Sequence, residues 1–232
     1  MDTLLDPLSY AFFQKGLIVA TISGALLGFI GVYIVLRGMS YIGHGLSHVI
    51  FGGYAAMQLF AAQLYVLGAG LWGVASALAI TNVARRSRLG ADAAIGVVTT
   101  ASFALGVALF ARFGSSGPAF DNALFGSILG ITNAQIFWLL VVTAFTGIVV
   151  FTRYRALMFT TFDPEVANVS GVRTGRTEAL LMVMLSLAIL VTLTVIGVTL
   201  VAAMLVIPAV IARMLTDSFA KMLVLSTVVG SF

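Results

Sequence analysis

The only two histidines of the chain, His44 and His48, lie four residues apart in an apolar stretch. On a helix this spacing places both imidazoles on one face, where two neutral ring nitrogens can bind one metal ion. For a single histidine, a packed and hydrogen-bonded role would be the ordinary interpretation. Polar groups inside a membrane segment are costly, however, and tend to mark transport pathways. The pair therefore predicts a contact site for a metal ion.

Other chemistries of a histidine pair are excluded by the sequence. A zinc protease of the His-Glu-x-x-His type has its general base beside the first histidine, but this chain has Gly45 there. Haem held by two histidines needs ligands on opposite faces of the macrocycle, which neighbours one helical turn apart cannot provide. The chain also lacks a Gly-x-x-x-x-Gly-Lys-Ser/Thr phosphate loop. We therefore expect a chain that is not an enzyme and has no permanently bound cofactor.

Further residues are candidates for a pathway or a structural role. Gly52 and Gly53 would leave room for a passage beside the histidines and would expose carbonyl oxygens. Asp92 lies near the start of an apolar span, where we expect an N-cap or a partner for an arginine rather than a metal ligand. Pro208 lies in an apolar run and has no N–H donor, so we expect a broken helix near Ile207.

The elements that must position these residues are membrane helices. Hydrophobic residues make up 61% of the chain and charged residues only 9%, whereas an ordinary soluble domain is about 25% charged. Backbone groups in lipid must be paired within a helix or around a closed barrel, and the long apolar stretches lack the alternation of barrel strands. We predict an all-α polytopic bundle, a single transmembrane domain over residues 1–232, with about eight transmembrane helices. The predicted spans are 17–36, 41–64, 66–84, 92–112, 134–152, 178–196, 198–215 and one that begins near 220.

Basic residues sort to one side of these spans. If the N-terminus is outside, only Lys15 and Arg112 lie outside the membrane. The other basic residues would face the cytoplasm: Arg37, Arg85, Arg86, Arg88, Arg153, Arg155, Arg173, Arg176, Arg213 and Lys221. This asymmetry follows the positive-inside rule and predicts a multi-pass protein of the cell membrane with its N-terminus outside. The net charge of +4 therefore needs no nucleic-acid partner.

The longest polar stretch, Arg153 to Glu178, is expected to be a loop with a short helix inside it. Asp163 is typical of an N-cap, Pro164 of a first helical position and Glu165 of a first turn. We predict a helix over Pro164 to Ser170, closed by Gly171. From these residues alone, the stretch either docks to a partner or simply connects two spans.

The last predicted span is short. From Met222 to Phe232 the chain has enough residues for about half of a crossing at 1.5 Å per residue. We therefore expect the last helix to be truncated.

Five segments together resemble the ABC-3 family, the membrane permeases of zinc, manganese and iron ABC importers. The segments are Arg37 to Gly53, Arg88 to Gly106, Leu124 to Ile131, Phe162 to Gly171 and Leu205 to Arg213. The resemblance implies a fold similar to the vitamin B12 importer's membrane subunits. It also implies a homodimer that binds two cytoplasmic ATPase subunits and receives metal from an extracytoplasmic binding protein.

The resemblance also implies roles for particular residues. The segment of about 160–176 would contain the coupling helix that binds the ATPase. Its matching residues are Phe162, Asp163, Pro164, Glu165, Ala167 and Gly171. Family members commonly have an acidic residue and then a histidine where this chain has His44 and His48. On ligand softness, the extra imidazole favours zinc, iron or copper over manganese.

We therefore expect the permease subunit of an ATP-driven importer for zinc, manganese or iron, with ATP bound only by the partner. The alternative is a self-contained secondary metal transporter driven by an ion gradient. Such a transporter would need ionisable groups within its spans, whereas Asp92 and Glu178 lie near span ends.

Overall fold

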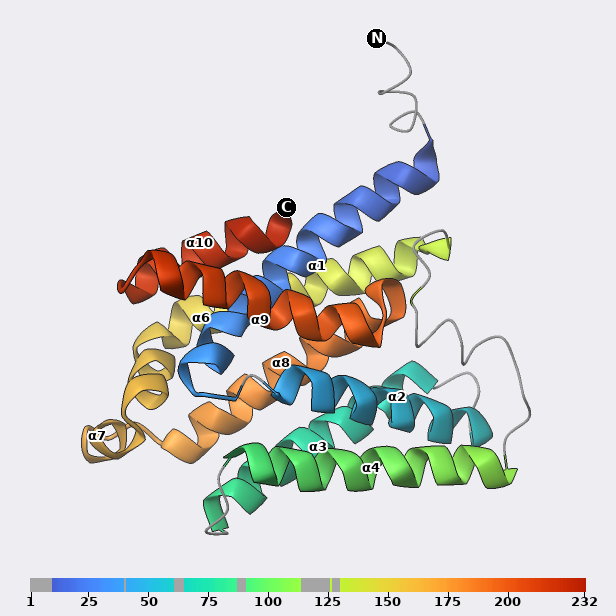
Figure 1. Cartoon of the computed structure of the whole chain (residues 1–232), viewed down its shortest axis with the longest axis horizontal. Coiled ribbons are helices and arrows are strands. Elements are labelled where there is room, and N and C mark those ends of the chain that lie inside the picture. Colours follow the sequence, from blue (N-terminus) through green and yellow to red (C-terminus); the bar gives the residue numbers. More distant parts are fainter. Residues whose placement is uncertain (1–9, 40, 61–64, 87–90, 114–125, 127–129) are drawn as a thin grey trace.

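The computed structural model describes residues 10–39, 41–60, 65–86, 91–113, 126 and 130–232. Within these residues the structure has α-helices and no strands (Figure 1). The helices are α1 (Ala11–Leu36), α2 (Ile42–Phe60), α3 (Tyr65–Arg86), α4 (Ala91–Phe113), α6 (Asn133–Phe162), α7 (Pro164–Val169), α8 (Thr174–Ile196), α9 (Val198–Leu215) and α10 (Phe219–Ser231). The all-α class predicted from the sequence is confirmed.

Six of these helices are long and apolar enough to cross a membrane, as judged over the described residues. They are α1, α3, α4, α6, α8 and α9. The other two predicted spans are also helices but do not meet that measure. In α2 the two histidines and Gln58 lower the hydropathy, and α10 has 13 residues in the structure.

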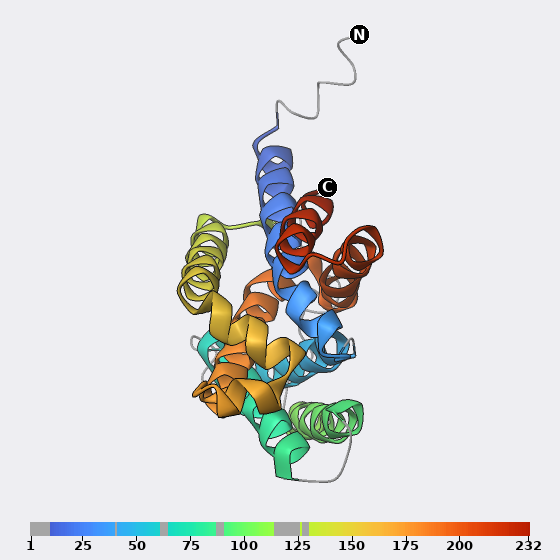
Figure 2. The same cartoon turned by 90° about the vertical axis from the view of Figure 1, so that its left-hand side faces the viewer.

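Helix α1 is apolar on all sides, and 12 of its 26 residues are buried. It lies between α6 on one side and α9 with α10 on the other (Figure 2). Gly24 faces the backbone of Gly230, and Gly28 faces Ser226, whose hydroxyl donates a hydrogen bond to the Gly28 carbonyl. Small residues at this spacing let helix backbones approach closely within a membrane.

The predicted break near Ile207 is wrong. Helix α9 continues through Pro208 to Leu215. A proline removes one backbone hydrogen bond, but packing of neighbouring helices can compensate in a membrane bundle. Pro208 is buried and lies against Gly28 of α1. The interruption lies earlier, at Gly197 between α8 and α9, where φ is +81°.

The predicted loop from Arg153 to Glu178 is mostly helix. Helix α6 continues to Phe162, with one non-helical residue at Arg153 (φ −111°, ψ 16°), and α8 begins at Thr174. After the kink, Leu157, Thr160 and Thr161 are buried at the three- and four-residue spacing of one helix face. That spacing was present in the sequence, but the surrounding arginines favoured a loop.

Candidate functional site

The two histidines lie on one face of α2, as their spacing predicts. Their ring centroids are 4.5 Å apart and the ring planes meet at 74°. Both side chains are partly buried. Two imidazoles on successive turns can therefore present nitrogens to the same small ion.

The neighbours of α2 show which way this face points. Gly43 faces Leu205 of α9, and Gly45 faces Thr99 of α4. His44 lies between these two glycines in sequence, so its side chain points between the directions of α9 and α4. Gly53, on another side of the helix, lies against Trp72 of α3. In Figure 1, α2 accordingly lies between α9 and α4. The histidine pair thus occupies a side of α2 that α3 does not cover.

His48 has one ring nitrogen without a partner. Its Nδ1 is buried and finds no hydrogen bond among the described residues. The ring of Phe103 on α4 lies 5.2 Å away, centroid to centroid, nearly edge-on. A buried polar atom normally has a partner, so a metal ion or a water molecule could complete this environment.

The residues around the pair add few further donors. The ring of Tyr41 lies 5.5 Å from that of His44. The hydroxyl of Ser47 donates to the carbonyl of Gly43 in its own helix, at 2.7 Å. Among the described residues, no group of three or more histidine, cysteine or acidic side chains is placed to hold a metal ion. The described part of the chain therefore offers two side-chain ligands at this point.

The other candidate pathway residues pack helices together. Gly52 approaches the backbone of Phe103 on α4, and a Cβ on Gly106 would overlap the backbone of Gly52. A Cβ on Gly53 would lie 2.7 Å from the Cβ of Trp72. These contacts fill the space in which a passage was expected and favour the structural role for Gly52 and Gly53.

Asp92 lies away from the histidines. It is exposed in the first turn of α4, where a negative charge stabilises the helix N-terminus. Thr99, which contacts α2 at Gly45, lies about 10 Å further along α4 at 1.5 Å per residue. Asp92 is the second residue of α4, so it lies inside the first turn and is not the N-cap that the sequence suggested.

The short helix α7 forms as its sequence predicts. Asp163 Oδ1 accepts hydrogen bonds from the backbone N–H groups of Glu165 (3.0 Å) and Val166 (2.9 Å), and Pro164 is the first helical residue. At the other end Gly171 has φ +83°. The N–H of Val172 donates to the Ala167 carbonyl, which closes the helix in a Schellman motif.

One side of α7 is apolar and exposed. Ala167 is fully buried against the bundle, whereas Val166 and Val169 are 55% and 90% exposed. Phe162, just before the helix, is 58% exposed and its ring also contacts that of Phe219 on α10. An exposed apolar patch on a helix that ends outside the bundle is typical of a protein-binding surface.

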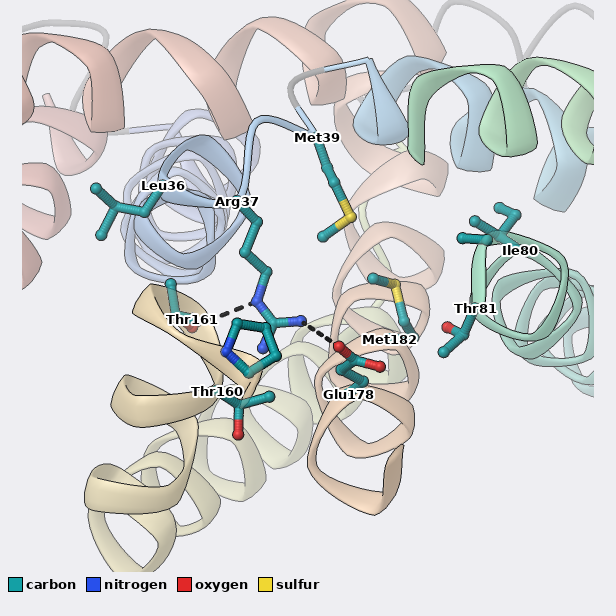
Figure 3. A pocket seen from close by; sticks show the side chains of 11 residues that line it. Leu36, Arg37, Met39, Ile80, Thr81, Thr160, Thr161, Glu178 and Met182 are labelled. Carbon is teal, nitrogen blue, oxygen red and sulfur yellow. Dashed lines mark hydrogen bonds and ion pairs between the residues drawn. The ribbon is translucent and has the colours of Figure 1, made fainter. Parts of the chain in front are cut away.

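Beside α7 lies a cavity of about 410 Å³ that the sequence did not predict. It lies between the end of α1, α3, the end of α6 and the start of α8, and Arg37 and Glu178 point toward each other across it (Figure 3). Arg37 Nε donates to Thr161 Oγ1 at 3.3 Å, and Arg37 Nη1 lies 3.9 Å from Glu178 Oε1. Burial lowers the pKa of the Arg37 guanidinium, and the carboxylate of Glu178 opposes this shift. The sequence had explained Arg37 only as a cytoplasmic charge.

Comparison with known families gives a match over nearly the whole chain. The model of the ABC 3 transport family matches residues 9–232. The manganese transport system membrane protein MntC of Halalkalibacterium halodurans is 35% identical over 96% of this chain and 76% of its own length. The chelated iron transport system membrane protein YfeD of Yersinia pestis is 33% identical over 97% of this chain and 75% of its own length.

Solved structures show the same architecture. A chain of PsaBC from Streptococcus pneumoniae, solved in complex with Fab, aligns with a TM-score of 0.85 and 30% identity, covering 99% of this chain and 83% of that chain. An inward-facing metal-chelate type ABC transporter aligns with a TM-score of 0.74 over 94% of this chain and 73% of that chain. Its sequence identity is 17%, so this second likeness concerns the fold alone.

Proposed function

This chain belongs to the ABC 3 transport family, and we propose that it is the permease subunit of an ATP-driven importer for a divalent transition metal. The observation that carries the proposal is the histidine pair on the side of α2 that α3 does not cover, in a chain that matches the family over residues 9–232. The chain is a multi-pass membrane protein with several helices of membrane-spanning length.

The transported ion passes His44 and His48. The relatives are named for manganese and iron, and zinc is the third candidate because two neutral imidazoles suit it. Two protein ligands hold an ion more loosely than a closed four-ligand site, which suits a substrate that must be released. Gly52, Gly53 and Pro208 position α2 and α9 around this pathway by close packing.

A second copy of the chain completes the pathway. The described residues bring no third histidine or acidic ligand to the pair, and the pair faces the side of α2 that α3 leaves uncovered. In a homodimer with these faces opposed, the second copy's equivalent pair could supply further nitrogens to the same ion.

Energy reaches the permease through α7. In this proposal, Phe162, Asp163, Pro164, Glu165, Ala167 and Gly171 form the coupling segment that docks on a cytoplasmic ATPase. The exposed Val166 and Val169 supply apolar contact, and the capped ends keep the helix rigid. ATP binding closes two such ATPases and moves α7, and an extracytoplasmic binding protein delivers metal to the opposite side.

The arrangement of the helix ends supports the proposed orientation, with the N-terminus outside. Figure 1 places the end of α1, the end of α3, α7 and the junction of α9 with α10 at one end of the bundle. Most of the basic residues lie in or beside these segments, which supports a cytoplasmic location for this end under the positive-inside rule.

Uptake into sealed vesicles tests this function. Vesicles contain the chain with its ATPase and binding protein, and zinc, manganese and iron are offered together and measured by elemental analysis. We expect accumulation of at least one metal that requires ATP hydrolysis, with an ATPase lacking its catalytic glutamate as the control. Accumulation without ATP that follows an ion gradient would instead show a secondary transporter and contradict the proposal.

A further inference from the structure

Arg37 is held more firmly than a cytoplasmic surface charge needs to be. Its side chain is only 9% exposed, and it contacts Thr161 at the end of α6 and Glu178 near the start of α8. These two contacts lie on either side of α7 in the sequence, because α7 is the link between α6 and α8. Arg37 therefore contacts both helices that flank α7 in the sequence, α6 and α8.

The backbone around Arg37 is equally well fixed. Arg37 is the C-cap of α1, and Gly38 follows with φ +69°. The N–H of Gly38 donates to the Val35 carbonyl and that of Met39 to the Ile34 carbonyl, both at 3.1 Å, which is a Schellman motif. The N–H of Ile42, the first residue of α2, then donates to the Met39 carbonyl at 3.0 Å. These hydrogen bonds connect Gly38 and Met39 to the end of α1, and Met39 to the first residue of α2.

The histidines follow closely after these hydrogen bonds in the sequence. His44 lies in the first turn of α2, so a displacement of Arg37 would change the position of the helix end that carries it. The cavity of about 410 Å³ lies between Arg37, Pro164 of α7 and Thr81 of α3, and it gives the side chains at this junction space to move.

We propose that Arg37 is a positioning residue that links movement of α7 to the start of α2. This inference rests on the proposed function, because it assumes that an ATPase moves α7. When α7 shifts, Thr161 and Glu178 shift with the ends of α6 and α8. The guanidinium carries that movement to the end of α1 and, through the Met39 carbonyl, to the first residue of α2. Arg37 itself touches neither the metal nor the ATPase.

The chemistry of the guanidinium supports a linking role over a role in stability alone. Nη2 of Arg37 is buried and has no hydrogen-bond partner among the described residues. Replacing a buried ion pair with apolar groups is often neutral or stabilising. The planar guanidinium of arginine has several N–H donors, however, so it can bond to two helices at once, which an apolar side chain cannot do.

The test measures how much metal is transported per ATP hydrolysed in the assembled transporter. The main variant combines Arg37→Met with Glu178→Gln, so that no lone charge stays buried. We expect metal transported per ATP to fall by about tenfold, within the range for residues that couple distant sites. Metal bound without ATP, and the amount of assembled complex, should stay as in the wild type.

If the double variant fails to assemble, a single substitution and its matched control provide the test. Thr161→Val removes the hydroxyl that accepts from Arg37 Nε, and we expect about a twofold fall in metal per ATP. Thr81→Val is the matched control, because Thr81 also lines the cavity but its hydroxyl donates to Ala77 in its own helix. The control should transport as the wild type does.

Each result decides between the two proposals. Suppose that the wild type is active and that the double variant transports the same amount of metal per ATP. That result would overturn the role of Arg37 but not the proposed function. If the double variant does not assemble, an unchanged ratio in Thr161→Val would have the same meaning. A fall matched by an equal loss of assembled complex or of bound metal would also overturn it, since that is the result of a structural role. A wild-type complex without ATP-dependent uptake would overturn the proposed function and this inference together.

Discussion

The histidine pair of α2 and the junction around Arg37 are neighbours in sequence but differ in how their polar groups are held. The imidazoles have ring centroids 4.5 Å apart, and Nδ1 of His48 has no partner among the described residues. Arg37 also has one buried nitrogen without a partner among the described residues, Nη2. Its Nε and Nη1, in contrast, contact two helices, and its backbone is fixed by a Schellman motif.

This difference is consistent with two separate tasks. A transported ion must be released, so its ligands benefit from being few and incompletely satisfied. A segment that transmits movement must instead be fixed to its neighbours, because a loose connection would absorb the displacement. Each prediction below changes either the histidine pair with its surroundings or the segment that transmits movement, but not both.

The largest effect is expected where α2 and α4 approach most closely. A Cβ on Gly106 would overlap the backbone of Gly52, so Gly106→Ala should force α2 and its histidines away from α4. We expect a loss of about 2–3 kcal/mol of stability, as for overpacked cores, measured as a lower melting temperature of the detergent-solubilised complex.

Gly96→Ala is the matched control for that change, on the same helix. A Cβ on Gly96 would have no heavy atom within 4 Å, so the substitution should be neutral or stabilise by about 0.5–1 kcal/mol through helix propensity. Equal melting temperatures for the two variants would show that the close approach of α2 and α4 does not hold the histidine face in place.

An intermediate effect is expected for His44→Asp, which sharpens the metal side of the comparison. A carboxylate is a harder ligand than imidazole and suits manganese better. We expect the ratio of manganese to zinc uptake to rise about tenfold, equivalent to 1.4 kcal/mol. His44→Asn is the control without the charge and should lower uptake of both metals. An unchanged ratio of manganese to zinc uptake in His44→Asp would show that His44 does not determine which metal is transported.

The smallest effect is expected for Asp163→Ala, which disturbs the α7 side alone. Loss of the two N-cap hydrogen bonds should destabilise α7 by about 1 kcal/mol, seen as faster backbone hydrogen exchange over residues 164–169. Asp217→Ala is the control, because Asp217 is 99% exposed and pairs, within the described part of the chain, with Arg213 four residues earlier. Equal exchange in α7 for both variants would contradict the capping role.

Local signals in the sequence predicted much of this arrangement. The spacing of His44 and His48 determines a shared helix face, and Asp163 with Pro164 determines where α7 begins. Both depend on interactions within a few residues, which is why they could be predicted without knowledge of the neighbouring helices.

What the sequence did not predict depends on contacts between distant segments. Arg37 meets Thr161 and Glu178 only after α1, α6 and α8 pack together. Pro208 stays inside α9 because α1 packs against it. Gly52 and Gly53 were expected beside a passage, but which helix approaches a glycine depends on tertiary packing. The extension of α6 beyond Arg153 was detectable from its buried spacing and was outweighed by its charges.

The most direct test of the account compares wild type with the double variant His44→Ala plus His48→Ala in vesicles with the ATPase and binding protein. Metal uptake and ATP hydrolysis are measured in the same preparation. We predict that ATP-driven uptake falls by at least about 100-fold, equivalent to 2.7 kcal/mol, while assembly and ATP hydrolysis continue. Uptake equal to the wild type would contradict the central claim that the ion passes this histidine pair.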